Sequence, residues 1–179
     1  HDYALSFYGP PSDWNVSYIT DMTGIFNENN YFNEDISAWD VSNVTSMSYM
    51  FNTAIFNQDI SNWNVSNVKD MSYMFSGGSS FNQDISVWDV SNVTTMKYMF
   101  YDNKVFNQDI STWNLRTRNV LDTKYMFADS IFDKNIVTWH VGNVTDMQFM
   151  FSNSAYTQNL RGINIQDDSK TLMELLEME

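Results

Sequence analysis

Tryptophan recurs along this chain at a nearly constant interval, and this period constrains the fold more than any other feature. The six tryptophans are Trp14, Trp39, Trp63, Trp88, Trp113 and Trp139. They recur roughly every 25 residues, and Ile163 continues the series at the next expected position. Self-similarity at such a period is typical of repeat proteins, in which each unit buries its apolar side chains against its neighbours. Residues 14–165 are therefore predicted to form about six stacked repeats plus a seventh strand.

The apolar positions inside one unit predict a strand followed by a helix. In the unit 56–75, Trp63 and Val65 are two residues apart, which places both side chains on one face of a strand. The next apolar residues follow at offsets of three, three and one: Val68, Met71, Met74 and Phe75. That spacing lines one side of a short helix. The expected fold is an α/β repeat: a leucine-rich-repeat-like solenoid with short parallel strands on one face, short helices on the other and tryptophans stacked inside.

The two ends of the chain depart from the repeat, and the whole chain is one domain by length. Residues 1–13 are rich in aromatic side chains and then read Gly-Pro-Pro, so they are predicted to cap the first unit. Residues 166–179 begin with a helix-start signal and continue with leucines at helical spacing. This segment is predicted to be a C-terminal capping helix.

Two of the repeats are irregular. The first carries Gly24 and Ile25 where later units have tyrosine and methionine. The unit that begins at Trp113 contains two extra residues around Arg116 and Arg118, which predicts a bulged loop. Arginine forks pair with carboxylates and phosphates and are enriched at interface hot spots, so this loop is a candidate binding corner. The alternative is a tolerated insertion whose arginines offset neighbouring acids.

The units 32–51, 56–75 and 81–100 carry the pattern I-x-x-W-x-V-x-x-V most clearly. They resemble the family of roughly 25-residue repeats of unknown function found in mycoplasma surface lipoproteins and BspA-like leucine-rich-repeat surface proteins. The resemblance extends over about residues 14 to 165. It implies a leucine-rich-repeat-like solenoid at the cell surface or secreted, with a role in adhesion and no catalytic residues.

Composition excludes several classes of function. The formal net charge is −13, from 22 acidic and 9 basic side chains, which argues against nucleic acid and anionic membranes as partners. Lys69 is the first lysine or arginine of the chain, and eight acids precede it. There is no cysteine, and no apolar run reaches the roughly 18 residues that a membrane span needs. Two histidines and no nucleophile–histidine pattern predict that the chain is not an enzyme.

Three rows of side chains repeat with the period and are candidate sites. The first row follows the tryptophans and is predicted to face outward: Asn15, Asp40, Asn64, Asp89, Asn114 and His140. It is either a hydrogen-bonded ladder or a polar recognition surface. The second row is Asp35, Asp59, Asp84 and Asp109. These carboxylates either accept local backbone N–H groups in Asx turns or share Ca²⁺ ions.

The third row is aromatic and runs along the expected helical side: Tyr49, Tyr73, Tyr98, Tyr125 and Phe149. Such a row either stacks on sugars and partner side chains or fills the seams between units. The sequence as a whole predicts a non-enzymatic interaction module, adhesin-like or scaffolding, that binds a protein or glycan along one face. The alternative is a structural subunit docked in a larger multiprotein assembly. No cofactor is predicted apart from possible calcium at the aspartate row.

Overall fold

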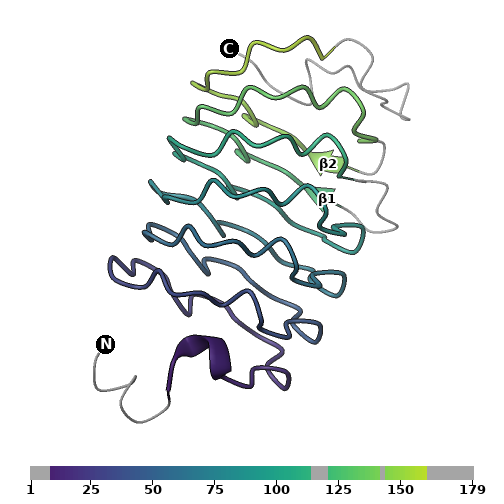
Figure 1. Cartoon of the computed structure of the whole chain (residues 1–179). Helices are drawn as coiled ribbons and strands as arrows, with labels where there is room; N and C mark the ends of the chain where they lie inside the picture. Colours follow the sequence, from purple (N-terminus) through teal and green to yellow (C-terminus); the bar gives the residue numbers. More distant parts are fainter. Residues whose placement is uncertain (1–8, 114–120, 142–143, 161–179) are drawn as a thin grey trace.

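The chain folds into a stack of similar coils, each covering the next along a single axis (Figure 1). The computed structural model describes residues 9–113, 121–141 and 144–160. Regular secondary structure in this part of the chain is sparse: the 3-10 helix η1 (Pro11–Asp13) and the strands β1 (Leu121–Asp122) and β2 (Val144–Asp146). Most of each coil consists of turns and irregular backbone, so backbone hydrogen bonds between the coils, rather than helices or long strands, hold the stack together.

The predicted helix of each unit is wrong, because the segment forms a ribbon of consecutive turns. Across the second coil, alternate N–H groups donate to carbonyls of the next coil at 2.9–3.0 Å: those of Met47, Tyr49, Phe51 and Thr53. The intervening N–H groups of Met50, Asn52 and Ala54 donate to carbonyls three residues earlier at 3.2–3.3 Å. In an α-helix, all of these N–H groups would donate to carbonyls of the same coil. The ribbon shares them between the coil and its neighbour.

Two local features divert the backbone from a helix. Asp70, which stands where a helix would begin, accepts the N–H of Ser72 at 2.8 Å in an Asx turn. Tyr73 then has φ +58°, in the left-handed region that interrupts a right-handed helix. Apolar residues three apart therefore share an inner face in this ribbon as they would in a helix, which is why the spacing alone predicted the wrong element.

The predicted strand in each unit is also wrong. Around the tryptophan of the third coil, Trp63 N–H donates to the Ile60 carbonyl and Val68 N–H to the Val65 carbonyl, both across three residues. The segment is therefore turned rather than extended. Strand pairing occurs elsewhere, where β1 and β2 pair in parallel and single parallel bridges join the preceding coils. A leucine-rich-repeat-like α/β solenoid, with its strand face and helix face, is therefore the wrong fold class.

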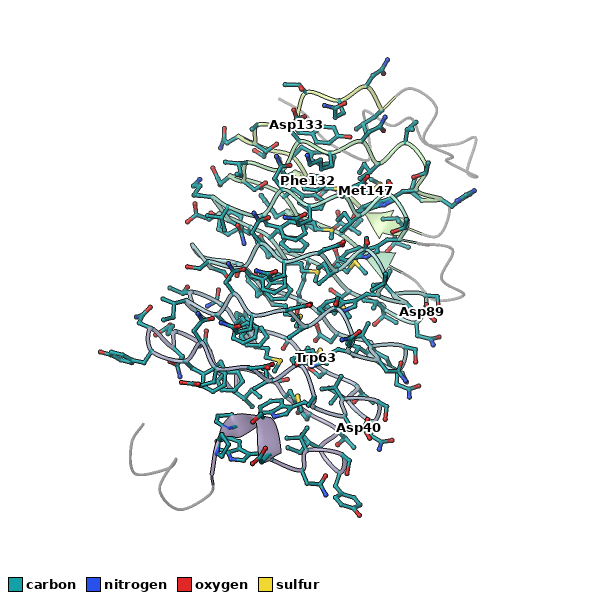
Figure 2. All side chains as sticks on the ribbon, viewed as in Figure 1. Asp40, Trp63, Asp89, Phe132, Asp133 and Met147 are labelled. Carbon is teal, nitrogen blue, oxygen red and sulfur yellow. The ribbon has the colours of Figure 1, made fainter. Side chains whose placement is uncertain are left out.

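The core is built from columns of stacked aromatic rings. Trp39 and Trp63 lie 6.4 Å apart with planes within 2° of parallel, and Phe51 stacks on Phe75 at 5.8 Å. A third column includes Phe56, whose ring lies 4.1 Å from that of Phe51. Such separations are typical of aromatic pairs that contribute to stability beyond their buried area. Figure 2 shows Trp63 and Phe132 within the stack, whereas Asp40 and Asp89 lie at its edge.

Each buried indole also binds the neighbouring coil through a hydrogen bond. Trp63 Nε1 donates to the Ile36 carbonyl at 3.1 Å, and Trp88 Nε1 donates to the Ile60 carbonyl at the same distance. The pattern continues with Trp113 and Trp139 at 3.0 Å. A tryptophan can be buried here because its one polar atom has a partner in the preceding coil.

A column of asparagine side chains links the coils at a second edge. The Oδ1 atoms of Asn33, Asn57, Asn82 and Asn107 each accept a backbone N–H of the following coil at 2.8–3.0 Å. Gln83 and Gln108 add side-chain bonds to two of these asparagines. The repeated Phe-Asn-Gln-Asp motif therefore has a structural role, which the sequence analysis had not assigned.

The predicted ends are only partly within the described residues. In the cap 1–13, the Pro11 carbonyl of η1 accepts the indole N–H of Trp39 at 2.7 Å, so this segment does contact the stack. The predicted C-terminal helix over 166–179 lies outside the described residues.

Candidate binding face

The predicted aromatic row is a continuous stack at the surface of the coils. The ring centroids from Tyr49 through Tyr73, Tyr98 and Tyr125 to Phe149 are separated by 4.4, 4.6, 4.8 and 4.9 Å. Adjacent planes lie within 6° to 21° of parallel. Four members are partly buried and Tyr49 is exposed, so the row is neither core nor free surface. Inside the row each ring covers its neighbours' faces, which leaves mainly ring edges and hydroxyls to meet a partner.

The turn ribbon places these rings on the outside. Every residue of the row has φ between +55° and +58°, a conformation that costs an aromatic L-residue about 1 kcal/mol or more. Each occupies the third position of a turn, as Tyr49 does in the turn closed by Met50 N–H and the Met47 carbonyl. Left-handed backbone at this position turns the side chain away from the core methionines on either side. Stacking between the rings offsets part of the backbone cost.

The phenols of Tyr73 and Tyr98 remain protonated at neutral pH. Burial, with the neighbouring phenols of Tyr49 and Tyr98 as smaller causes, raises the pKa of Tyr73 to about 12. The pKa of Tyr98 is also raised, first by burial and then by Tyr125. These hydroxyls can therefore donate hydrogen bonds to a ligand over the whole physiological range.

A cation accompanies the C-terminal end of this row. Lys124 Nζ lies 5.9 Å from the ring centroid of Tyr125 and 6.0 Å from that of Phe149. The same ammonium donates to Gln148 Oε1 at 2.8 Å and lies 3.8 Å from Asp146 Oδ2. Aromatic ring, ammonium and carboxylate thus meet in one group, which combines a cation–π contact with an ion pair.

The row that follows the tryptophans forms local turns. Oδ1 of Asn15, Asp40, Asn64 and Asp89 accepts the N–H of the serine two residues later at 3.0–3.2 Å. The bonds between coils come instead from the nearby Asn43, Asn67 and Asn92, whose Nδ2 atoms donate to serine carbonyls of the preceding coil. The hydrogen bonds between coils are therefore made by these asparagines and not by the row that was predicted. Asn114 lies outside the described residues, and His140 is partly buried.

The aspartates of the second row form Asx turns. Oδ1 of Asp35, Asp59, Asp84 and Asp109 accepts the N–H of Ser37, Ser61, Ser86 and Ser111 respectively, each at 2.9 Å. These bonds hold the pKa of Asp35, Asp59 and Asp109 below the ordinary value. Within the described ranges no three His, Cys, Asp or Glu side chains form a group that could hold a metal ion. The calcium hypothesis is a prediction that needs its own test.

Acid should destabilise the protein through this aspartate row. A carboxyl whose pKa is lowered on folding contributes stability above its unfolded pKa of about 3.9, and this contribution is lost as the pH falls through the folded value. Replacing Asp35, Asp59 and Asp109 with asparagine keeps the Oδ1 acceptor but removes the titration. We expect the melting temperature of this variant to fall less steeply below about pH 4 than that of the wild type. Equal acid slopes in thermal melts would contradict the prediction.

Calcium should leave the melting temperature of the chain unchanged if these aspartates serve only as turn acceptors. Bound Ca²⁺ would stabilise the folded state by linkage, in proportion to the logarithm of its concentration. The measurement is a pair of melting curves, one in chelator and one in millimolar calcium. A rise in melting temperature that disappears when Asp59 and Asp84 are changed to asparagine would instead establish a shared cation site.

The predicted arginine corner is not part of the described structure, since Arg116 and Arg118 both lie outside it. The end of the aromatic row, where Gly24 occupies the tyrosine position, was not among the predicted sites. The sequence signal that could have indicated this end is Gly24 itself, because the first repeat has glycine where the later repeats have tyrosine.

Fold and surface together define a class: an acidic repeat protein whose coils present a stacked aromatic row along one side. The chain belongs to the family described as Mycoplasma protein of unknown function, DUF285, whose profile matches residues 3–113 and again 81–175. Two overlapping matches agree with an internally repeated chain. Comparisons with curated proteins and with solved structures gave no match. Among the described residues, no helix is long and apolar enough to cross a membrane.

Proposed function

We propose that this chain is a non-enzymatic interaction module, adhesin-like or scaffolding, which binds a protein or glycan along the aromatic row at the cell surface or outside the cell. The observation that carries the proposal is the stack of Tyr49, Tyr73, Tyr98 and Tyr125 at the surface of an acidic protein. Tyrosine is enriched at binding hot spots because it combines a large apolar area with a hydroxyl. Placement at the cell surface rests on the resemblance to surface proteins.

The row is pre-organised, which favours binding. Each inner ring is held by two neighbours, so a partner that contacts it immobilises few side-chain rotamers. The left-handed backbone at Tyr73 and Tyr98 also directs these rings away from the core, where a partner can reach them.

A structural subunit is the second candidate, and a different surface supports it. Ile55, Val105 and Ile131 occupy equivalent positions in their coils and are all exposed. Aliphatic side chains repeated along one row form the kind of surface that a permanent partner covers. The two candidates therefore assign binding to different rows of the same stack.

Two variants distinguish these candidates. The first replaces Tyr73 and Tyr98 with asparagine, which tolerates φ near +58° and removes the rings. The second replaces Ile55 and Ile131 with asparagine. Each is compared with the wild type for capture of surface and matrix glycoproteins and of partners from the native source.

The proposal expects the tyrosine variant to lose capture and the isoleucine variant to retain it. Loss of a stoichiometric complex only in the isoleucine variant would favour the structural subunit. Full capture by both variants would contradict both assignments. Changing Arg116 and Arg118 to alanine in the same assay tests the arginine corner, with weaker capture expected at an unchanged melting temperature.

A further inference from the structure

The aromatic row ends in the first coil at a glycine. Gly24 N–H donates to the Ser48 carbonyl at 2.9 Å, as Tyr49 N–H donates to that of Ser72. Its φ of +64° is close to the +56° of Tyr49. The backbone of the row therefore continues into the first coil, but the ring does not. A Cβ at Gly24 would meet only the Cβ of Asn27, at 3.7 Å, so a side chain has room there.

The missing ring leaves one face of Tyr49 without a ring stacked on it. Tyr49 stacks on Tyr73 at 4.4 Å on one side, and on the Gly24 side it contacts no other ring of the described residues. It is 38% exposed, whereas the other members of the row are all partly buried. An uncovered tyrosine face at the end of a row of parallel rings is a site where one more flat group can stack.

The carboxylate of Asp21, in the same coil as Gly24, selects the kind of group that can stack there. Asp21 stands three residues before Gly24, as Asp146 stands three residues before Phe149, and the two aspartates lie in the same row of bridges between coils. At the Phe149 end, the Lys124 ammonium lies between that carboxylate and the rings. At the Gly24 end, Asp21 supplies the carboxylate in the same coil as Gly24, Tyr49 supplies a ring in the next coil, and no lysine or arginine occurs in the sequence before Lys69. No described cation pairs with Asp21.

We propose that the Gly24–Tyr49 slot binds the guanidinium group of an arginine on a basic protein partner. The planar guanidinium stacks on the open Tyr49 face, and the Asp21 carboxylate accepts its N–H groups. A lysine ammonium has no plane to stack, and a neutral sugar ring has no positive charge to pair with the carboxylate. This inference rests on the proposed interaction function and specifies one partner group and its place. It does not depend on the tyrosines farther along the row.

Binding of short peptides to ring-labelled protein, followed by NMR shifts of the tyrosine signals, tests the proposal. The probe is a blocked peptide with one arginine flanked by glycines. Its matched controls carry citrulline, which is planar but neutral, or lysine, which is charged but not planar. We expect the arginine peptide to bind at least about fivefold more tightly than either control. Equal binding of the arginine and citrulline peptides would overturn the assignment.

Variants locate the site. Gly24→Tyr extends the row over the slot and should abolish the shift of the Tyr49 signals, whereas Gly24→Asn accepts the left-handed backbone without covering the ring. Asp21→Asn keeps the turn bond to the Thr23 N–H and should weaken binding, whereas Asp89→Asn should not. If Gly24→Tyr fails to fold, Tyr49→Leu takes its place, with Tyr31→Leu as the control on a tyrosine outside the row. Unchanged binding in Gly24→Tyr or Tyr49→Leu would overturn the proposal.

The outcome also separates this inference from the function on which it rests. If the arginine peptide does not bind but capture of glycoproteins still requires Tyr73 and Tyr98, the slot assignment is wrong and the interaction function stands. If methyl glucoside shifts the Tyr49 signals and the arginine peptide does not, the slot belongs to a sugar and the arginine assignment is likewise wrong. If neither probe binds and capture is also absent, both proposals fail.

Discussion

Replacing Trp63 with alanine should lower the free energy of unfolding by about 3 to 5 kcal/mol, the range for large-to-small changes in a core. The side chain is only 3% exposed, and its ring stacks on Trp39 at 6.4 Å and on Phe51 at 6.4 Å. The substitution leaves a cavity between two coils and deprives the Ile36 carbonyl of its indole donor. Urea denaturation followed by tryptophan fluorescence measures the change.

The matched control for this substitution is Tyr31→Ala, because Tyr31 is 84% exposed and removing it creates no cavity. We expect its effect to be within about 0.5 kcal/mol of zero. If Trp63→Ala cost no more than Tyr31→Ala, the tryptophan column would not be part of the core.

Replacing Asn103 with leucine should be costly although leucine has the same number of side-chain heavy atoms, branched at the same carbon. This fully buried amide donates to the Phe75 carbonyl at 3.0 Å and accepts the N–H groups of Val105 and Phe106 at 2.9 and 2.7 Å. Leucine leaves three backbone groups without a partner away from water, which should cost about 3 kcal/mol or more. Chemical denaturation of the variant measures the loss.

The first coil supplies the comparison for Asn103. Asn29 accepts the N–H groups of Tyr31 and Phe32 in the same way, at 3.0 and 2.8 Å, but it is only partly buried. Water can replace its side chain, so Asn29→Leu should cost about 1 kcal/mol or less. Equal losses at the two sites would show that burial does not set the cost.

The period, the stacking of units and the buried tryptophans could be predicted because they depend only on which residues are apolar and how often they recur. The elements inside the unit could not, because offsets of three residues suit a helix and a turn ribbon equally. Local hydrogen bonds and backbone angles decide between the helix and the turn ribbon. Asp70 accepts the N–H of Ser72, and Tyr73 adopts a positive φ. An aromatic side chain gives no indication that its backbone will adopt a positive φ.

The candidate rows were found by the same period, and their roles depended on geometry. Asp59 and Asp84 follow the Asx-turn rule, which the position of a serine two residues later makes readable in the sequence. Whether the rings of Tyr73 and Tyr98 fill a seam or face outward depends on the handedness of the backbone at one residue. Sequence spacing does not contain that information.

The turn ribbon also gives the molecule a direction. From Met47 to Thr53 and again from Met71 to Gly77, the shared N–H groups all donate toward the later coil, so the ribbon of each coil offers donors on one side and acceptors on the other. A coil can be duplicated or removed in the interior without disturbing this match, provided its orientation is kept. Two copies of the stack brought together by like ends would set donor against donor or acceptor against acceptor along the ribbon. Any extension of this architecture, within one chain or between chains, is therefore complementary only from head to tail.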